Sequence, residues 1–383
     1  MEFHQLLREW PPGFGGVERV AHELGNARGG VVFSLDVQRQ RSVTDDPLPV
    51  AYQRVSLRSI AVIGRFHLPL PSKTLFHLLF SQEHLHGHLP SPGVLLILVL
   101  ARCIHPKRTV SAHWHCFLTS RNFFYRSFFS IYQHLALSVL PFLSKVVTTS
   151  PILADVLRSS TPLDSQIVVL PCCLSEFQES SAISLPLPIA IKTTPLRVLF
   201  IGRLDSYKRL DWVLDALSRL NSSWTLSVIG DGTKRQLFEE ISQQLFAQRL
   251  IANPDLVQFH GRLSEELKYQ QMALADLLVL PSDCSNEAFG IVQLEAMAAG
   301  RPSLAFNQPR SGMGWVCQLP SLSWSQTPEG LVDVLERLAN QPALRSLLAH
   351  EARDRYLNLF SRSIWCQQLM DFVNYAKDGS LKH

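Results

Sequence analysis

The stretch that decides the fold is NEAFGIVQLEAMAAG, residues 286–300. It follows a short apolar run, Asp276–Leu280, and a polar loop, as expected where a buried parallel strand leads into a helix. The helix is expected over Phe289–Ala299, because Gly300 and then Pro302 end it. In parallel α/β sheets, ligands bind at the edge where strands end and helices begin. Residues 286–300 are therefore the first candidate for a binding site.

The alternation of strand and helix continues on both sides of this stretch. In the second half, we expect strands at Leu196–Ile201, Trp224–Ile229, Leu256–Phe259, Asp276–Leu280 and Pro302–Phe306, and helices at Asp211–Leu220, Lys234–Phe246 and Ser264–Ala273. In the first half, we expect strands at Gly29–Leu35, Ser59–Ile63, Val94–Leu100, Thr109–Ala112, Lys145–Thr149 and Ile167–Leu170. This alternation predicts an α/β fold with doubly wound parallel sheets.

The length of 383 residues suits two domains better than one. Ser181–Thr194 is rich in Pro, Ser and Ala, which indicates a linker. The expected organisation is a first domain, a linker, a second domain and a C-terminal helix that crosses back to the first domain, at residues 1–183, 184–194, 195–360 and 361–383 respectively. Trp365, Leu369 and Phe372 should share one face of that helix.

The composition excludes several classes of protein. Hydrophobic residues make up 46% and charged residues 18%, as in a globular protein with sizeable cores. Seven cysteines without regular spacing indicate reduced thiols. A net charge of +4 is too small to indicate nucleic-acid binding. The basic excess and most histidines lie in the first half, which could face anionic lipid or a phosphate-bearing acceptor, or could be an ordinary surface.

Two apolar segments bear on membrane contact. Val94–Ala101 is too short to span a bilayer. Phe123–Val147 is aromatic but interrupted by Arg126 and Gln133, so it is either a core helix or an amphipathic helix near a membrane surface. The first residues lack the basic and apolar pattern of a secretion signal. We expect a cytoplasmic protein that is at most peripheral on the inner face of the plasma membrane.

Two carboxylates mark the 286–300 stretch. Glu287 precedes the helix and Glu295 lies about two turns inside it, so the pair can flank one elongated ligand at different depths. Between them, the amides of Phe289, Gly290 and Ile291 open the helix, where free N–H groups suit a phosphate. Gly290 lets the backbone come close to the ligand. The alternative is two glutamates that only pair with basic side chains at a surface.

A second cluster, GRLDSYK at residues 202–208, follows the first strand of the second half. Arg203 and Lys208 can converge on one diphosphate, Arg as a planar fork and Lys as a point charge. A diphosphate leaving group needs its charge neutralised as the bond to it breaks. The alternative is two solvated cations in a loop.

Together, these stretches resemble the retaining glycosyltransferases of the GT-B fold, family-4 type. The resemblance rests on an E-x7-E motif from Glu287 to Glu295, a GR-x4-K loop over 202–208, a G-D-G turn over Gly230–Gly232, and an F-x-G segment over Phe259–Gly261. It covers the second half closely and the first half loosely. It implies two Rossmann-like domains that face each other across a cleft.

The resemblance also implies roles for single residues. Glu287 would hydrogen-bond the donor sugar, Glu295 would hold the ribose, and the backbone near Arg262 and Leu263 would meet the base. The implied donor-binding residues of the second half are Gly202, Arg203, Lys208, Gly230, Arg262, Leu263, Glu287, Phe289, Gly290, Ile291 and Glu295. Those of the first half are Gly15 and Gly16, in a glycine-rich turn that opens a helix.

Histidines in the first half are also candidates. The resemblance implies that a histidine of the HWH segment, His113 to His115, contacts the donor sugar, with His115 preferred and His113 in reserve. The implied catalytic set is then Glu287, His115, Arg203 and Lys208. A second group, His84, His86 and His88, has the count of a metal-binding strand but lacks Cys or carboxylate companions, so we expect no metal site.

The expected activity is transfer of a hexose from a UDP- or GDP-sugar, with retention, to a lipid-linked glycan acceptor in envelope polysaccharide synthesis. No cofactor is required, because Arg203 and Lys208 supply the neutralising charge. The alternatives are a transferase with a small soluble acceptor and a catalytically silent nucleotide-sugar-binding or scaffold protein. Two segments depart from the family pattern. Relatives carry a turn glycine and an acid where this chain has Leu170–Phe177, and a double glycine where it has Pro309–Gly314.

Overall fold

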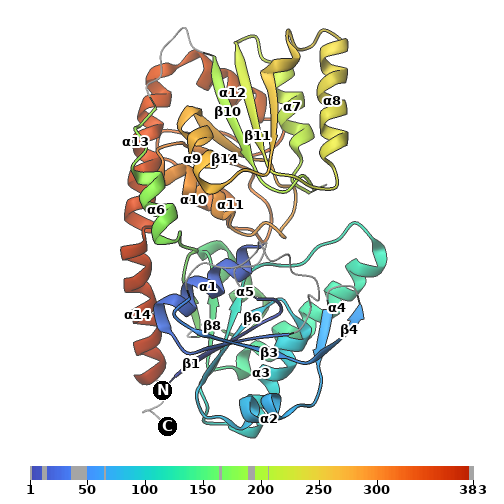
Figure 1. Ribbon diagram of the computed structural model, residues 1–383, viewed down its shortest axis with the longest axis vertical. Helices are drawn as coiled ribbons and strands as arrows, with labels where there is room; N and C mark the ends of the chain where they lie inside the picture. The colour runs from blue at the N-terminus through green and yellow to red at the C-terminus, as the bar shows by residue number, and fades with distance from the viewer. Residues whose placement is uncertain are drawn as a thin grey trace. The chain divides into compact units, whose positions relative to one another are not determined.

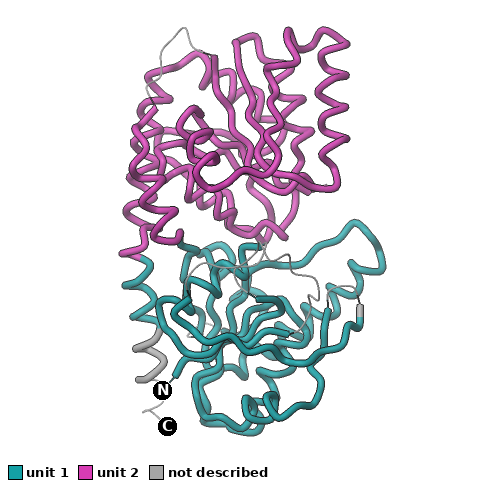
Figure 2. The backbone as a smooth tube through the Cα atoms, in the orientation of Figure 1, with its two compact units in different colours: residues 1–173, 365–383 teal, residues 174–364 magenta. Residues whose placement is uncertain are grey.

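The computed structural model divides the chain into two compact units (Figure 2). Unit 1 comprises Met1–Cys173 and Trp365–His383, and unit 2 comprises Leu174–Ile364. Each unit has its own parallel sheet, so the predicted α/β class with two Rossmann-like halves is confirmed. The residues that the structure describes are 2–10, 15–35, 50–63, 66–163, 166–188, 195–205 and 207–378.

Unit 1 is built on a parallel sheet in the order β3-β2-β1-β6-β7-β8-β9 (Figure 1). Its strands are β1 (Phe3–Leu7), β2 (Val31–Leu35), β3 (Gln53–Leu57), β6 (His84–Leu89), β7 (Val110–Trp114), β8 (Lys145–Thr148) and β9 (Ile167–Val169). Its helices are α1 (Gly16–Arg28), α2 (Lys73–Phe80), α3 (Pro92–Ile104), α4 (Phe123–Val139), the 3₁₀ helix η2 (Leu140–Phe142) and α5 (Pro151–Ser160). A separate antiparallel hairpin joins β4 (Ser59–Ile63) to β5 (Phe66–Pro69).

Two strand predictions in this half need correction. The predicted strand Val94–Leu100 lies inside α3, because a fully apolar run has the same pattern in a buried strand and a buried helix. Pro92 in the first turn and a length of 13 residues decide for the helix. The predicted strand Ser59–Ile63 forms, but it pairs with β5 and not with the main sheet.

Unit 2 holds a parallel sheet in the order β12-β11-β10-β13-β14. Its strands are β10 (Leu196–Ile201), β11 (Trp224–Ile229), β12 (Val257–Gly261), β13 (Leu277–Leu280) and β14 (Ser303–Ala305). Its helices are α6 (Glu176–Ile183), α7 (Leu210–Ser218), α8 (Arg235–Ala247), the 3₁₀ helix η3 (Pro254–Leu256), α9 (Glu265–Leu274), α10 (Ile291–Ala298), α11 (Met313–Val316), α12 (Leu331–Asn340) and α13 (Pro342–Leu359). Every strand and helix predicted in this half is present, with small shifts at the ends.

The division between the units differs from the predicted one. Residues 174–183, which the sequence placed in the first domain, belong to unit 2. The reason is that α6 is bonded there: Gln178 Nε2 donates to Glu265 Oε2 at 3.0 Å, and Tyr356 Oη donates to Glu179 Oε1 at 2.9 Å. Helix α14 (Arg362–Asp378) starts in unit 2, and its residues from Trp365 onward are grouped with unit 1. Most of the predicted linker, residues 189–194, lies outside the described residues.

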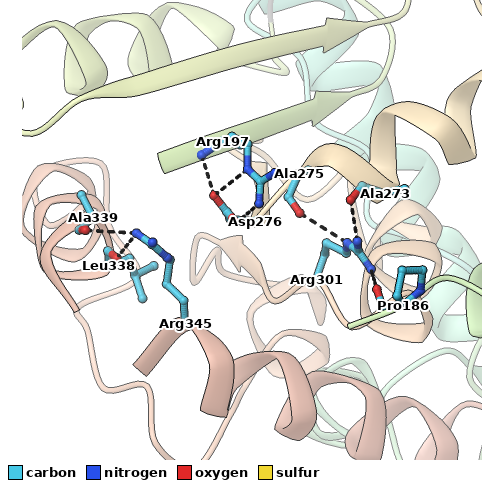
Figure 3. Close-up of polar contacts among 9 residues, drawn as sticks. All are labelled: Pro186, Arg197, Ala273, Ala275, Asp276, Arg301, Leu338, Ala339 and Arg345. Atoms are coloured by element: carbon cyan, nitrogen blue, oxygen red, sulfur yellow. Dashed lines mark hydrogen bonds and ion pairs between the residues drawn. The ribbon is translucent and has the colours of Figure 1, made fainter. Parts of the chain in front are cut away.

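Arg197, which is partly exposed, and the buried Arg301 make polar contacts at the amino-terminal edge of the unit 2 sheet (Figure 3). Asp276, just before β13, accepts from the Arg197 backbone N–H at 2.8 Å and from its Nη2 at 2.7 Å. Arg301 donates to the carbonyls of Pro186 and Ala273 at 2.8 and 2.7 Å. These charges are used to satisfy backbone groups and hold elements together. A binding site in unit 2 must therefore use charges at the opposite, carboxyl edge.

Candidate functional site

Glycines bring the loops at the carboxyl ends of β10 and β11 into contact. Gly230 has φ +130°, and a Cβ on it would lie 1.9 Å from the Gly202 carbonyl oxygen. A Cβ on Gly232 would lie 2.6 Å from the Leu204 carbonyl oxygen. The backbone N–H of Leu204 donates to Asp231 O at 3.0 Å. Gly230 and Gly232 therefore fix the shape of the loop that carries Arg203 and Lys208, and the predicted residue Gly202 takes part through its carbonyl group.

Lys208 and Glu287 form an ion pair between Nζ and Oε2. The lysine side chain is 9% exposed and the glutamate side chain 16% exposed. Burial alone would lower the pKa of Lys208, but the Glu287 carboxylate, together with Tyr207, outweighs it and raises that pKa above its ordinary value. Lys208 therefore stays charged at neutral pH. The structure thus brings together two predicted site residues from the loops after β10 and β13.

Arg203 stands next to this ion pair and is more open. Its side chain is 56% exposed, and its Nη2 donates to Tyr207 Oη at 3.1 Å. Burial lowers its pKa, but Tyr207, Asp205 and Glu287 outweigh it and raise that pKa. A guanidinium that is exposed and held near Lys208 can close on an anion.

Helix α10 opens beside Glu287. Its N-cap, Gly290, has φ +74° and ψ +75°, a left-handed conformation in which a Cβ would lie 2.4 Å from Leu280 Cδ2. Only glycine fits this position without strain. Ile291 is the first helical residue, so the helix starts two residues later than predicted. Phe289, which the sequence placed inside the helix, is buried in the loop, where its ring meets Phe360 edge-on at 5.9 Å.

The loop after β14 supports Glu287 from behind. Ser311 Oγ donates to the Glu287 carbonyl oxygen at 2.6 Å, and the Gly312 N–H donates to Ala288 O at 2.8 Å. This segment lacks the family's double glycine, yet it holds the Glu287 loop through two hydrogen bonds. Sequence reasoning noted the departure but assigned no role to Ser311.

Glu295 has a different partner. It is 4% exposed, and its Oε2 lies 2.5 Å from Nζ of Lys268 on α9, which also pairs with Glu265 at 2.8 Å. Arg262 and Leu263, at the start of the α9 segment, are exposed and half-buried. The two glutamates of the motif therefore sit in two separate ion pairs. Lys268 is a residue that sequence reasoning missed, because no local pattern reports a partner 27 positions away.

The candidates of unit 1 lie on α1 and β7. Gly15 is the N-cap of α1, and a Cβ on it would lie 2.6 Å from Glu18 Oε2, while Gly16 is the first helical residue. His115 directly follows β7, is 6% exposed, and its Nε2 lies 2.9 Å from His88 Nδ1. His113 is fully buried and its ring stacks on that of His115 at 4.1 Å. Burial, followed by the neighbouring histidines, lowers the pKa of both rings well below the ordinary value.

Helix α4 has a largely open apolar face. Only Tyr132, Gln133 and Ala136 are buried on it. The exposed apolar side chains are Phe123, Phe124, Tyr125, Ile131 and Leu135, and Phe142 on η2 adds to them. Within the described residues, none of the helices combines the length and the hydropathy that crossing a bilayer requires.

Comparison with known proteins then identifies the class. A family profile described as Glycosyl transferases group 1 matches residues 195–340. Over 371 residues, the chain is 24% identical to O-antigen chain mannosyltransferase C of Escherichia coli, and the match covers 94% of each chain. By sequence and by fold, the chain is similar to the GT-B glycosyltransferases.

Solved structures match the fold over nearly the whole chain. The crystal structure of Anabaena Alr3699/HepE in complex with UDP matches with a TM-score of 0.72 at 17% identity, over 98% of this chain and 100% of that one. The apo form of the lipopolysaccharide outer core galactosyltransferase WaaB matches with a TM-score of 0.70 at 15% identity, over 98% and 99% of the two chains. The predicted fold and enzyme class are confirmed, whereas the family-4 type, the retaining mechanism and the residue roles remain predictions.

Proposed function

We propose that this glycosyltransferase moves a hexose from a UDP- or GDP-sugar to a lipid-linked glycan, with retention of anomeric configuration. The observation that carries the proposal is the buried Lys208–Glu287 ion pair, next to Arg203 and the start of α10. One carboxylate and two cations meet there at the carboxyl edge of a parallel sheet, where nucleotides bind in such folds.

Charge neutralisation is the main task of Lys208 and Arg203. When the bond from the anomeric carbon to the β-phosphate oxygen breaks, negative charge grows on the diphosphate. Lys208 is held in place by Glu287, so it needs little reorganisation to stabilise that charge. Arg203 is exposed enough to fold onto the diphosphate as a fork. The amides of Ile291 and Val292 at the start of α10 add N–H donors for a phosphate.

Glu287 has a second role at the sugar. The ion pair uses its Oε2, so Oε1 can accept a hydrogen bond from a sugar hydroxyl. In the proposed reaction, the acceptor oxygen bonds to the anomeric carbon on the face that the diphosphate leaves. The acceptor proton passes to the leaving phosphate oxygen, which balances the step. Glu295 is proposed to hold the ribose hydroxyls, with Lys268 paired to its carboxylate.

The proposal for the acceptor rests on two further observations. The relative that matches over most of its length is an O-antigen chain mannosyltransferase, and the structural neighbour WaaB is a lipopolysaccharide galactosyltransferase. The exposed aromatic face of α4 also carries Arg126, which lies 5.6 Å from the Phe123 ring. Aromatic rings with nearby arginines suit the surface of an anionic membrane, where a lipid-linked acceptor is found.

The first experiment tests the donor. Purified full-length protein is incubated with UDP- and GDP-hexoses, GDP-mannose among them, and release of nucleoside diphosphate is measured. The wild type should turn over at least one donor, and Glu287→Gln should reduce kcat by about 10²–10³-fold. Glu239→Gln, which breaks an exposed ion pair with Arg235, is the matched control and should keep full activity. Turnover of no donor by the wild type contradicts the proposal.

The second experiment tests the acceptor and the membrane. The protein should sediment with anionic liposomes at low salt and be released at high salt. Phe123→Ser with Phe124→Ser should reduce sedimentation, whereas Phe177→Ser, which removes a phenylalanine of similar exposure from α6, should not. Equal sedimentation of all variants, or transfer to small soluble glycosides alone, would favour the soluble-acceptor alternative.

A further inference from the structure

Five histidines line one face of two neighbouring strands in unit 1. On β6, His84, His86 and His88 alternate, so they point to the same face. On β7, His113 is the register partner of His88, and it projects to that same face. His115 follows at the strand end. Each of the five is at most 7% exposed.

Three of these rings converge. Nitrogen atoms of His86, His88 and His113, one from each ring, all lie within 4.8 Å of one another. The ring centroids of His86 and His88 are 5.2 Å apart, and each lies 5.7 Å from the centroid of His113. Strand β7 therefore adds a third nitrogen ligand, from His113, to the two that His86 and His88 offer from β6.

Hydrogen bonds fix which ring nitrogens carry lone pairs. Gln5 Nε2 donates to Ala21 O at 3.1 Å, so Gln5 Oε1 faces His88 and accepts from its Nε2–H at 2.9 Å. His88 Nδ1 then carries no proton and has a lone pair that can bind a metal. His86 Nδ1 meets Ser111 Oγ at 2.8 Å, while Nε2 of His86 and both ring nitrogens of His113 have no hydrogen-bond partner among the described residues.

We propose that His86, His88 and His113 form a buried binding site for a divalent transition metal of the Zn²⁺ type. The arrangement has the features that such a site requires. Each metal-binding imidazole usually donates its other N–H to an oxygen, as His88 does to Gln5 and His86 can to Ser111. Three buried ring nitrogens without a partner are costly unless something binds them.

The protonation state suits a metal as well. Burial, and then the neighbouring His84, lowers the pKa of His86 to about 3. Burial followed by the other rings holds the pKa values of His88 and His113 well below the ordinary value. The rings are therefore neutral at pH 7 and need lose no proton on binding a metal.

The geometry is close to that of an occupied site. With Zn–N bonds of about 2.0–2.1 Å, tetrahedral nitrogens lie about 3.4 Å apart, so each ring has to move its nitrogen by about 1 Å or less. His115 Nε2 lies 2.9 Å from His88 Nδ1 but is not a member of the converging group, so the three rings are the proposed protein ligands. A metal bound by these rings joins β6 to β7.

The test uses the full-length chain, freed of any affinity tag and stripped with a chelator. Zn²⁺ is titrated by calorimetry and Co²⁺ by its visible absorption, since tetrahedral cobalt absorbs strongly. The wild type should bind about one ion per chain, with a rise in the melting temperature of unit 1. Gln5→Met should weaken Zn²⁺ binding by about 10- to 100-fold, and His86→Gln or His113→Gln by more than that.

Two control variants keep the result interpretable. His4→Gln removes a buried histidine of the neighbouring strand β1 that lies outside the three-ring group, and it should leave the affinity unchanged. His350→Gln removes an exposed histidine and should also have no effect. Near-UV circular dichroism shows that each variant is folded before titration. Binding that persists unchanged in His86→Gln and His113→Gln, or no binding to the wild type, overturns the proposal.

Discussion

Acidification should destabilise unit 1 through its buried histidines, with His84 and His86 as the best-defined contributors. Burial, helped by the positive charges of Arg28 and Arg108, lowers the pKa of His84 from 6.5 to about 3. Burial, helped by His84, does the same for His86. Both rings pack against Phe372 of α14 and share Ser111 Oγ as a hydrogen-bond partner. A proton on either ring would be a buried charge, and among the described residues no carboxylate acts on either ring to offset it.

The sign and size of the effect follow from linkage. Between pH 6.5 and pH 3, the unfolded chain binds a proton on each ring that the folded chain does not, so the free energy of unfolding falls as the pH falls. One pKa unit corresponds to about 1.4 kcal/mol. The two rings together therefore lower the free energy of unfolding of unit 1 by about 3 kcal/mol at pH 5.5 and by about 5 kcal/mol at pH 4.5. That loss is a large share of the stability of an ordinary domain.

Urea unfolding of the full chain at a series of pH values, with a chelator present, measures this slope. The double variant His84→Gln/His86→Gln should show a slope of unfolding free energy against pH that is lower by about 2.7 kcal/mol per unit. His350→Gln, in unit 2, should keep the wild-type slope. The slope is informative even if the double variant is less stable at pH 7. An unchanged slope in the double variant would show that His84 and His86 do not cause the loss of stability at low pH.

Other predictions concern unit 2. Gly290→Ala should lower the free energy of unfolding by about 2–5 kcal/mol, because the backbone is left-handed and the new Cβ clashes with Leu280. Gly261→Ala should lower it by only about 1–2 kcal/mol, because its near neighbour is the flexible Arg235 side chain. Equal losses in urea unfolding would show that the contact with Leu280 does not destabilise Gly290→Ala. Asp276→Asn should cost about 1.5–3 kcal/mol, because it weakens the three hydrogen bonds from Arg197 that join β10 to β13, and an unchanged unfolding midpoint would count against that role. Lys208→Met should reduce kcat by about 10²–10³-fold with little change in fold, and near-wild-type turnover would remove Lys208 from the chemistry.

The second half was predictable because each signal was local. The apolar run Leu196–Ile201 is a buried parallel strand, Ser264 caps α9 by accepting from the Leu267 N–H, and Gly300 ends α10 with φ +71°. Each depends on residues a few positions apart, which a single sequence displays. Strands β10 and β13 are parallel neighbours, so the loops that follow them bring Arg203, Lys208 and Glu287 to the same edge of the sheet.

The first half was harder because its signals depend on partners far along the chain. Strand β6 was missed since His84, His86 and His88 do not read as strand residues, and they become core residues only beside β1 and β7. Helix α3 was mistaken for a strand since its residues are apolar on every side. The expectation of no metal site is untested; it considered only His84, His86 and His88, whereas His113 joins the proposed group through strand pairing.

The central claim is that unit 2 holds a nucleotide-sugar at Lys208, Arg203 and Glu287. The most direct measurement incubates the wild type and Lys208→Met with a mixture of UDP- and GDP-sugars, removes free ligand, and identifies the retained molecule by mass. The wild type should retain a nucleoside diphosphate hexose, and Lys208→Met, equally folded, should retain little or none. Retention of no nucleotide-sugar by the wild type, or equal retention by both proteins, would contradict it.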